Sequence, residues 1–146
     1  FLARRVEALL VADSRHAYLL EGENLLQGLD ADLSAADPSF AAERVRRYGE
    51  VARLLIDTGL IVVSTSKTFG INYQRMAEMI RTLVQPAPVI AVHMSRAGEE
   101  PPPNTDLHFA GPQDFDAAAR QILEELKRRG VLIQPSGTKS TIQYSI

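Results

Sequence analysis

The sequence predicts an α/β fold with a largely parallel sheet and helices on both of its faces. Three apolar runs, at residues 17–20, 60–64 and 89–92, are short and continuous, which is typical of parallel strands that are covered on both faces. Between them lie longer segments in which apolar residues recur at helical spacing. This alternation predicts strands joined by right-handed crossover connections.

Length and composition fit a single globular domain. The chain has 146 residues, of which 45% are hydrophobic and 23% charged, and its net charge is −2. This balance indicates neither a nucleic-acid partner nor an acidic membrane surface. The chain has no cysteine, and no apolar run approaches the roughly 20 residues that span a bilayer. We therefore predict a cytoplasmic protein without a membrane partner. Because its first residue is phenylalanine, we expect the chain to be part of a longer protein.

The first half of the chain predicts helix, strand, helix and strand. A helix is under way from residue 1, because apolar residues through Leu10 share one face. The strand at 17–20 follows, and a polar loop then leads to a long helix over 40–57, which Gly59 ends. The inward positions of this helix follow its apolar spacing: Val45, Tyr48, Ala52, Leu55 and Ile56.

The second half repeats the alternation. A helix over 71–84 contains Met76 and Met79, which we assign to the core. After the strand at 89–92 and a stiff proline-rich loop, a short strand is predicted at 107–109 and a helix at 112–130. The inward positions of this last helix are Phe115, Ala118, Ile122, Leu123 and Leu126.

We divide the chain into a domain over residues 1–130 and a C-terminal extension over 131–146. Residues 140–146 alternate enough to form a strand or part of a hairpin. The preceding PSGTKST superficially resembles a phosphate loop, but it lacks a glycine directly before the lysine and a helix after it.

Two carboxylates follow the first predicted strand. Glu21, Gly22, Glu23 and Asn24 come directly after the apolar run at 17–20. Open α/β sheets bind ligands at the carboxyl edge of their strands. Two acids at this spacing can hold a magnesium ion through water, or take a proton from a hydroxyl. The alternative is an ordinary polar turn after a strand.

Two blocks of sequence resemble the adenylylsulfate (APS) kinases. Residues 17–29 read AYLLEGENLLQGL, which is similar to that family's strand and its turn of aspartate-glycine-aspartate-asparagine followed by arginine-histidine-glycine-leucine. Residues 43–54 read ERVRRYGEVARL, which is similar to the family's helix E-N-I-R-R-I-G-E-V-A-K-L. The likeness is good over residues 1–64 and looser over 88–130. It implies a P-loop kinase fold.

The resemblance also implies a reaction, the transfer of the γ-phosphate of ATP to the 3′-hydroxyl of adenylyl sulfate, with ATP and magnesium as cofactors. Glu23 corresponds to the family's catalytic aspartate, with Glu21 beside it. We assign Asn24, Arg44 and Arg47 to substrate binding, the two arginines as part of an anion-binding surface. The alternative for the arginines is a solvated helix face that is paired with neighbouring glutamates.

Several positions depart from the family's pattern. The family's central strand, glycine-rich phosphate loop and lysine are not among these residues. The arginine and histidine after the acidic turn are Leu26 and Gln27, a substrate-side arginine falls at Ala41, and an asparagine is replaced by Arg44. The family's basic lid is shortened to residues 95–100. Glutamate is also one methylene longer than aspartate, and a displacement on the order of 1 Å can cost about a hundredfold in rate.

Among the histidines, His93 lies at a predicted strand end. It either touches the site or is a satisfied structural histidine. His16 and His108 show no metal-ligand pattern, so no side chain is assigned as a metal ligand.

Two functions stay open. The first is a phosphotransferase of sulfate activation with degraded substrate and lid positions, whose partners are a nucleotide and adenylyl sulfate. The second is a non-catalytic, kinase-derived regulatory or assembly domain. In both cases we expect fusion to, or assembly with, other sulfate-activation domains. From these residues alone we detect no complete site for a cofactor.

Overall fold

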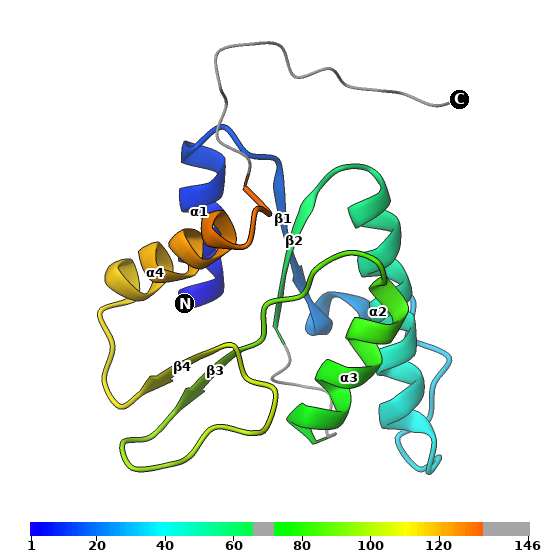
Figure 1. Cartoon of the computed structure of the whole chain (residues 1–146). Helices are drawn as coiled ribbons and strands as arrows, with labels where there is room; N and C mark the ends of the chain where they lie inside the picture. Colours follow the sequence, from blue (N-terminus) through cyan, green and yellow to red (C-terminus); the bar gives the residue numbers. More distant parts are fainter. Residues whose placement is uncertain (66–71, 133–146) are drawn as a thin grey trace.

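The computed structural model describes residues 1–65 and 72–132, in which helices are interleaved with strands (Figure 1). The elements in chain order are α1 (Leu2–Ala12), β1 (Ala17–Glu21), the 3-10 helix η1 (Gly22–Leu25), α2 (Phe40–Asp57), β2 (Ile61–Thr65), α3 (Tyr73–Val84), β3 (Val92–Ser95), β4 (Leu107–Ala110) and α4 (Phe115–Arg128). The predicted α/β class is confirmed, and the predicted limits of the long helix at 40–57 agree with those of α2.

The strands form parallel pairs, as predicted. β1 pairs with β2 so that Glu21 lies opposite Thr65, and β3 pairs with β4 so that Ser95 lies opposite Ala110. Within the described residues these pairs are two separate two-stranded sheets, whereas the sequence predicted one sheet. In each pair the carboxyl ends of the strands lie side by side, so that Glu21 at the end of β1 and Thr65 at the end of β2 share one edge.

Helices cover both faces of the strands. On one side, α1 and α4 enclose a core with Leu10, Ala119 and Phe109 at its centre, against which Ile61 and Val63 of β2 pack. On the other side, α2 and α3 enclose a second core around Val45, Tyr48 and Met76. Val62 packs against this second core, so β2 is covered on both faces. This coverage explains the continuous apolar run of β2.

α2 and α3 approach closely at Gly49 (Figure 1). A Cβ atom at this position would lie 2.5 Å from Cδ1 of Leu83 and 3.2 Å from Cδ1 of Ile80. The glycine therefore admits the side chains of α3 against the α2 backbone. Met76 is buried and Met79 packs against the same core, which confirms the assignment of these methionines.

One predicted strand is displaced along the chain. The run at 89–92 was predicted as the third strand, but β3 begins at Val92 and ends at Ser95. The backbone before it is fixed by a side chain, because the Ala91 amide donates to Oδ2 of Asp106 at 2.6 Å. Asp106 also pairs with Arg81 and Arg129. It therefore joins this segment to α3 and to the end of α4.

The last two helices begin later than predicted because side chains cap them. Asn72 accepts a hydrogen bond from the Arg75 amide at the start of α3. Asp114 accepts from the amides of Asp116 and Ala117, so α4 begins at Phe115. The inward assignment of Phe115 was wrong. Its side chain is 38% exposed and stacks on Phe1 with ring centroids 6.3 Å apart.

The proposed strand at 140–146 and the PSGTKST segment lie outside the described residues. The division of the chain at residue 130 stays a prediction. In the described part, no helix is both long enough and apolar enough to cross a membrane.

Candidate functional site

The carboxylate turn stands where β1 ends. Glu21 is the last residue of β1, and buried Gly22 begins η1, which carries Glu23 and Asn24. The side chains of Glu23 and Asn24 are exposed. Glu21 accepts a hydrogen bond from Nη2 of Arg4 on α1 at 3.2 Å. The two candidate catalytic carboxylates therefore differ, because among the described residues Glu21 has a cation within ion-pair distance and Glu23 has none.

Tyr48 holds the ends of the two strands behind this turn. Its hydroxyl donates to the Leu20 carbonyl at 2.6 Å and accepts from the Thr65 amide at 3.2 Å. The pKa of Tyr48 is raised to about 12, mainly by burial and to a smaller extent by the charges of Glu23 and Glu21, while hydrogen bonds with Ser64 and Thr65 oppose the rise. The phenol is therefore neutral at physiological pH and serves as a fixed hydrogen-bonding group at the base of the turn.

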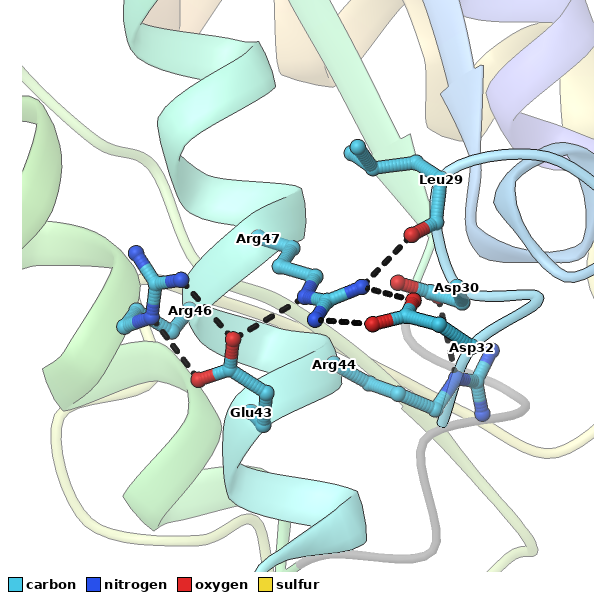
Figure 2. Close-up of polar contacts among 7 residues, drawn as sticks. All are labelled: Leu29, Asp30, Asp32, Glu43, Arg44, Arg46 and Arg47. Carbon is cyan, nitrogen blue, oxygen red and sulfur yellow. Dashed lines mark hydrogen bonds and ion pairs between the residues drawn. The ribbon is translucent and has the colours of Figure 1, made fainter. Parts of the chain in front are cut away.

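Arg44 forms a buried ion pair with the segment that follows η1 (Figure 2). Its Nε lies 3.3 Å from Oδ2 of Asp30, and the exposed fractions of the two side chains are 3% and 0%. Its guanidinium also lies over the Phe40 ring, 5.6 Å from the centroid. The cation predicted to meet a substrate is thus enclosed by groups of the protein itself.

Arg47 is paired nearer the surface, as Figure 2 shows. Its Nη1 donates to the Leu29 carbonyl at 2.6 Å, its Nη2 to Oδ2 of Asp32 at 3.0 Å, and its Nε to Glu43 at 2.9 Å. Arg46 donates to the same Glu43 carboxylate at 2.8 Å. Hydrogen bonds from Arg46 and Arg47 lower the pKa of Glu43 to about 2. The Arg47 hydrogen bond likewise lowers the pKa of Asp32.

The structure therefore arranges the candidate residues in two groups. Glu21, Glu23 and Asn24 lie on one turn at the end of β1. Arg44 and Arg47 lie on α2 and bind residues 29–32 of the segment between η1 and α2. Both groups border that segment, which also carries the exposed Leu26.

Sequence reasoning missed Arg4, Asp30 and the bridging role of Tyr48. For Tyr48 the sequence does carry a signal. A tyrosine stands here at a position where the motif of the APS kinases has isoleucine. For Arg4 the helical pattern of residues 1–10 reports only the apolar face, and its partner Glu21 lies 17 residues further along. Asp30 was part of a loop described only as polar. Its pairing with Arg44 depends on how that loop folds back onto α2.

His93 and His108 lie opposite each other on β3 and β4. Their ring centroids are 5.8 Å apart, and Nε2 of His108 lies 2.7 Å from Oγ of Ser95.

The described residues contain no group of three or more His, Asp or Glu side chains that could hold a metal ion. Glu21 and Glu23 fit a hydrated magnesium ion in chemistry, because magnesium prefers oxygen ligands and keeps several waters.

The chain is similar in sequence to adenylyl-sulfate kinases. It is 41% identical over 83 residues to the adenylyl-sulfate kinase of Aeromonas hydrophila, covering 57% of this chain and 40% of that protein. It is 28% identical over 160 residues to the adenylyl-sulfate kinase of Yersinia pestis, covering 90% of this chain and 73% of that protein. The chain thus spans about two fifths of the Aeromonas protein.

Its fold is also similar to a solved kinase. The APS kinase CysC of Mycobacterium tuberculosis, solved in complex with AMPPNP and APS, superposes with a TM-score of 0.70 at 23% identity, covering 86% of this chain and 88% of that one. The family model of adenylylsulphate kinase matches residues 1–102, which include β1, η1, α2 and β2. On this match the chain belongs to the adenylylsulphate kinase family.

Proposed function

We propose that this chain is a phosphotransferase domain of sulfate activation, which passes the γ-phosphate of ATP to the 3′-hydroxyl of adenylyl sulfate. The observation that supports this most is the carboxylate turn, with Glu21 and Glu23 at the carboxyl edge of a parallel strand pair. That edge is where open α/β sheets bind ligands. A related kinase is solved with AMPPNP and APS, which supports the same class of ligands here.

In this proposal Glu23 takes the proton of the attacking hydroxyl. Its side chain is exposed on the first turn of η1, so a ligand can reach it. Glu21, paired with Arg4, stands beside Glu23 as the second carboxylate of the turn. Magnesium neutralises phosphate charge when bound, and Glu21 and Glu23 are the residues that would hold it through water. Tyr48 keeps the strand ends beneath the turn in place.

On the substrate side we assign Asn24, Arg44 and Arg47, with weaker binding than in the family. Leu26 and Ala41 stand where the resembling family has arginines, and the segment at 95–100 is short for a lid. A site that keeps water weakens each electrostatic contact within it. We therefore propose a slow kinase whose substrate positions are degraded.

A second candidate is a non-catalytic regulatory or assembly domain derived from the kinase. One observation favours it, because both arginines assigned to the substrate already bind carboxylates of the protein. Such a domain would act together with other sulfate-activation domains. Cytoplasmic location is part of both proposals.

The test is ADP release by the full-length protein with magnesium-ATP and adenylyl sulfate. We expect slow turnover that depends on adenylyl sulfate, and its loss by at least a hundredfold in Glu23→Gln. Glu124→Gln is the matched control, because this glutamate lies on α4 and is 72% exposed. Turnover that is absent in the unmodified protein would favour the second candidate. Turnover that Glu23→Gln leaves unchanged would remove the assigned base.

A further inference from the structure

Arg44 and Asp30 form a pair that is fully enclosed. Each side chain is buried, with 3% and 0% of its surface exposed. The Arg44 guanidinium has a carboxylate on one side and the Phe40 ring 5.6 Å away. A ligand that used Nε of this guanidinium would have to displace Asp30 from the protein interior.

That displacement is costly because Asp30 depends on Arg44. Oδ1 of Asp30 is buried and has no hydrogen-bond partner within residues 1–65 and 72–132. Arg44 therefore supplies the compensating charge for this carboxylate. Removing one partner of a buried ion pair leaves an uncompensated charge, which is strongly destabilising. A buried pair of this kind does not exchange partners readily.

Asp30 is also a fixed point of the turn after η1. Its amide donates to the Leu25 carbonyl at 2.8 Å, and its carbonyl accepts from the Leu33 amide at 3.0 Å. The residues enclosed by the first of these bonds include Leu26 and Gln27, which follow Glu23, Asn24 and Leu25 in the chain. Whatever fixes Asp30 therefore fixes the backbone that continues the carboxylate turn.

We propose that Arg44 is a positioning residue, which through Asp30 fastens the turn at 25–30 to α2. This revises its assignment as a contact to the substrate. The inference rests on the proposed function only in taking this turn as the border of the ligand site. Arg47 differs, because its partner Asp32 is 66% exposed. Arg47 is therefore nearer to solvent than Arg44, and a ligand that binds it would compete with Asp32, Glu43 and the Leu29 carbonyl.

The first test is a double-mutant cycle on unfolding of this chain, with Arg44→Met, Asp30→Asn and the double variant. We expect Arg44→Met to raise the unfolding equilibrium constant about 100-fold to 1,000-fold. The double variant should recover at least tenfold relative to Arg44→Met, because no buried charge is left alone. Arg46→Met is the matched control, since Arg46 is 52% exposed on the same helix, and should change the constant less than threefold. Additive effects of the two substitutions would overturn the pairing.

If Arg44→Met does not fold, Asp30→Asn and the double variant still carry the second test. It measures hydrogen exchange of the Asp30 amide, which should become faster in the double variant while amides of β1 keep their rates. Uniformly faster exchange would indicate global destabilisation and contradict local positioning.

The third test is the KM for adenylyl sulfate in the full-length protein. Positioning predicts that the double variant lowers kcat and keeps KM within about twofold, whereas direct contact predicts a KM raised tenfold or more with little change in kcat. A protein without any turnover would contradict the proposed function, while the cycle and the exchange rates would still decide the role of Arg44.

Discussion

The hydroxyl of Tyr48 donates to the Leu20 carbonyl at 2.6 Å. This hydrogen bond joins α2 to β1 at the residue just before Glu21. The same oxygen accepts from the Thr65 amide at the end of β2. One side chain thus fixes two strand ends at the edge of the sheet where a ligand is expected. Because Tyr48 and Leu20 are buried, loss of the hydroxyl leaves the Leu20 carbonyl without this partner.

Tyr48→Phe should therefore lower the free energy of unfolding by about 1–3 kcal/mol. The substitution keeps the ring, so loss of packing contributes little. Urea unfolding followed by far-ultraviolet circular dichroism measures the change. Tyr18→Phe is the control, since Tyr18 is 44% exposed, and should change stability by less than about 0.5 kcal/mol. Equal effects of the two substitutions would contradict the role given to the Tyr48 hydroxyl.

Tyr48 also predicts an alkaline limit to stability. Its pKa in the folded chain is raised to about 12 from a usual value of 10.0. A raised pKa means that stability is fully present below pH 10 and is lost as the pH rises toward 12, because the unfolded chain ionises first. Urea midpoints between pH 9 and 12 should fall less steeply in Tyr48→Phe than in the unmodified chain. Identical slopes would argue against burial of this phenol.

Glu43 predicts the opposite dependence at acidic pH. Hydrogen bonds from Arg46 and Arg47 lower its pKa from 4.5 to about 2. A lowered pKa contributes stability above pH 4.5 that is lost as the pH falls toward 2, because the unfolded chain is protonated first. The Glu43 carboxylate is partly exposed, with 28% of its side chain accessible. Salt therefore screens its attraction to the two arginines. Glu43→Gln should flatten the stability profile between pH 4.5 and 2 at low ionic strength and change it less at 1 M salt.

How far the sequence predicts this structure depends on the range of the interactions involved. α2 was predicted within its observed limits, because its apolar spacing and Gly59 are local signals. The start of β3 was misplaced, since the apolar run at 89–92 ends at the residue where β3 begins. The deciding contact is between the Ala91 amide and the Asp106 side chain, 15 residues further along. No local pattern reports such a contact.

The site divides in the same way. The position of Glu21 and Glu23 at a strand end follows from an apolar run that stops at acids, and the structure agrees. The arginines on α2 were identified as cations, but their partners were not. Arg44 and Asp30 meet across 14 residues of loop and helix, and the geometry of that loop is not encoded in a periodic pattern. Charge composition alone could not distinguish a buried ion pair from an anion-binding surface.

The nucleotide site leads to a prediction about these 146 residues by themselves. The backbone amides and lysine that hold the β- and γ-phosphates in P-loop kinases are not part of this sequence. Calorimetric titration with magnesium-ATP should therefore show no saturation at micromolar ligand. Clear micromolar binding that Lys139→Met abolishes would contradict this and would assign the phosphate contact to the C-terminal extension.

The substrate side leads to a prediction of gained activity. Leu26 and Ala41 stand in place of two arginines in the resembling family, and a charge-assisted hydrogen bond contributes roughly 1.5–3 kcal/mol. Two such losses amount to about 3–6 kcal/mol if they are additive, or roughly two to four powers of ten in rate. Leu26 is 41% exposed and Ala41 is partly exposed in the first turn of α2. An arginine at either position therefore needs no buried space.

The full-length protein carrying Leu26→Arg and Ala41→Arg should release ADP faster with adenylyl sulfate than the unmodified protein, by tenfold or more in kcat/KM. The expected gain is smaller than the calculated loss, because Arg47 and Asp32 already occupy part of the surface and the loop at 95–100 stays short. Leu54→Arg is the matched control. Leu54 is 57% exposed on the same helix as Ala41, and an arginine there adds a single positive charge away from the carboxylate turn, so it should leave kcat/KM within twofold. Rapid turnover by the unmodified protein would show that other cations replace the missing arginines. An equal gain from Leu54→Arg would show that net charge acts through steering alone.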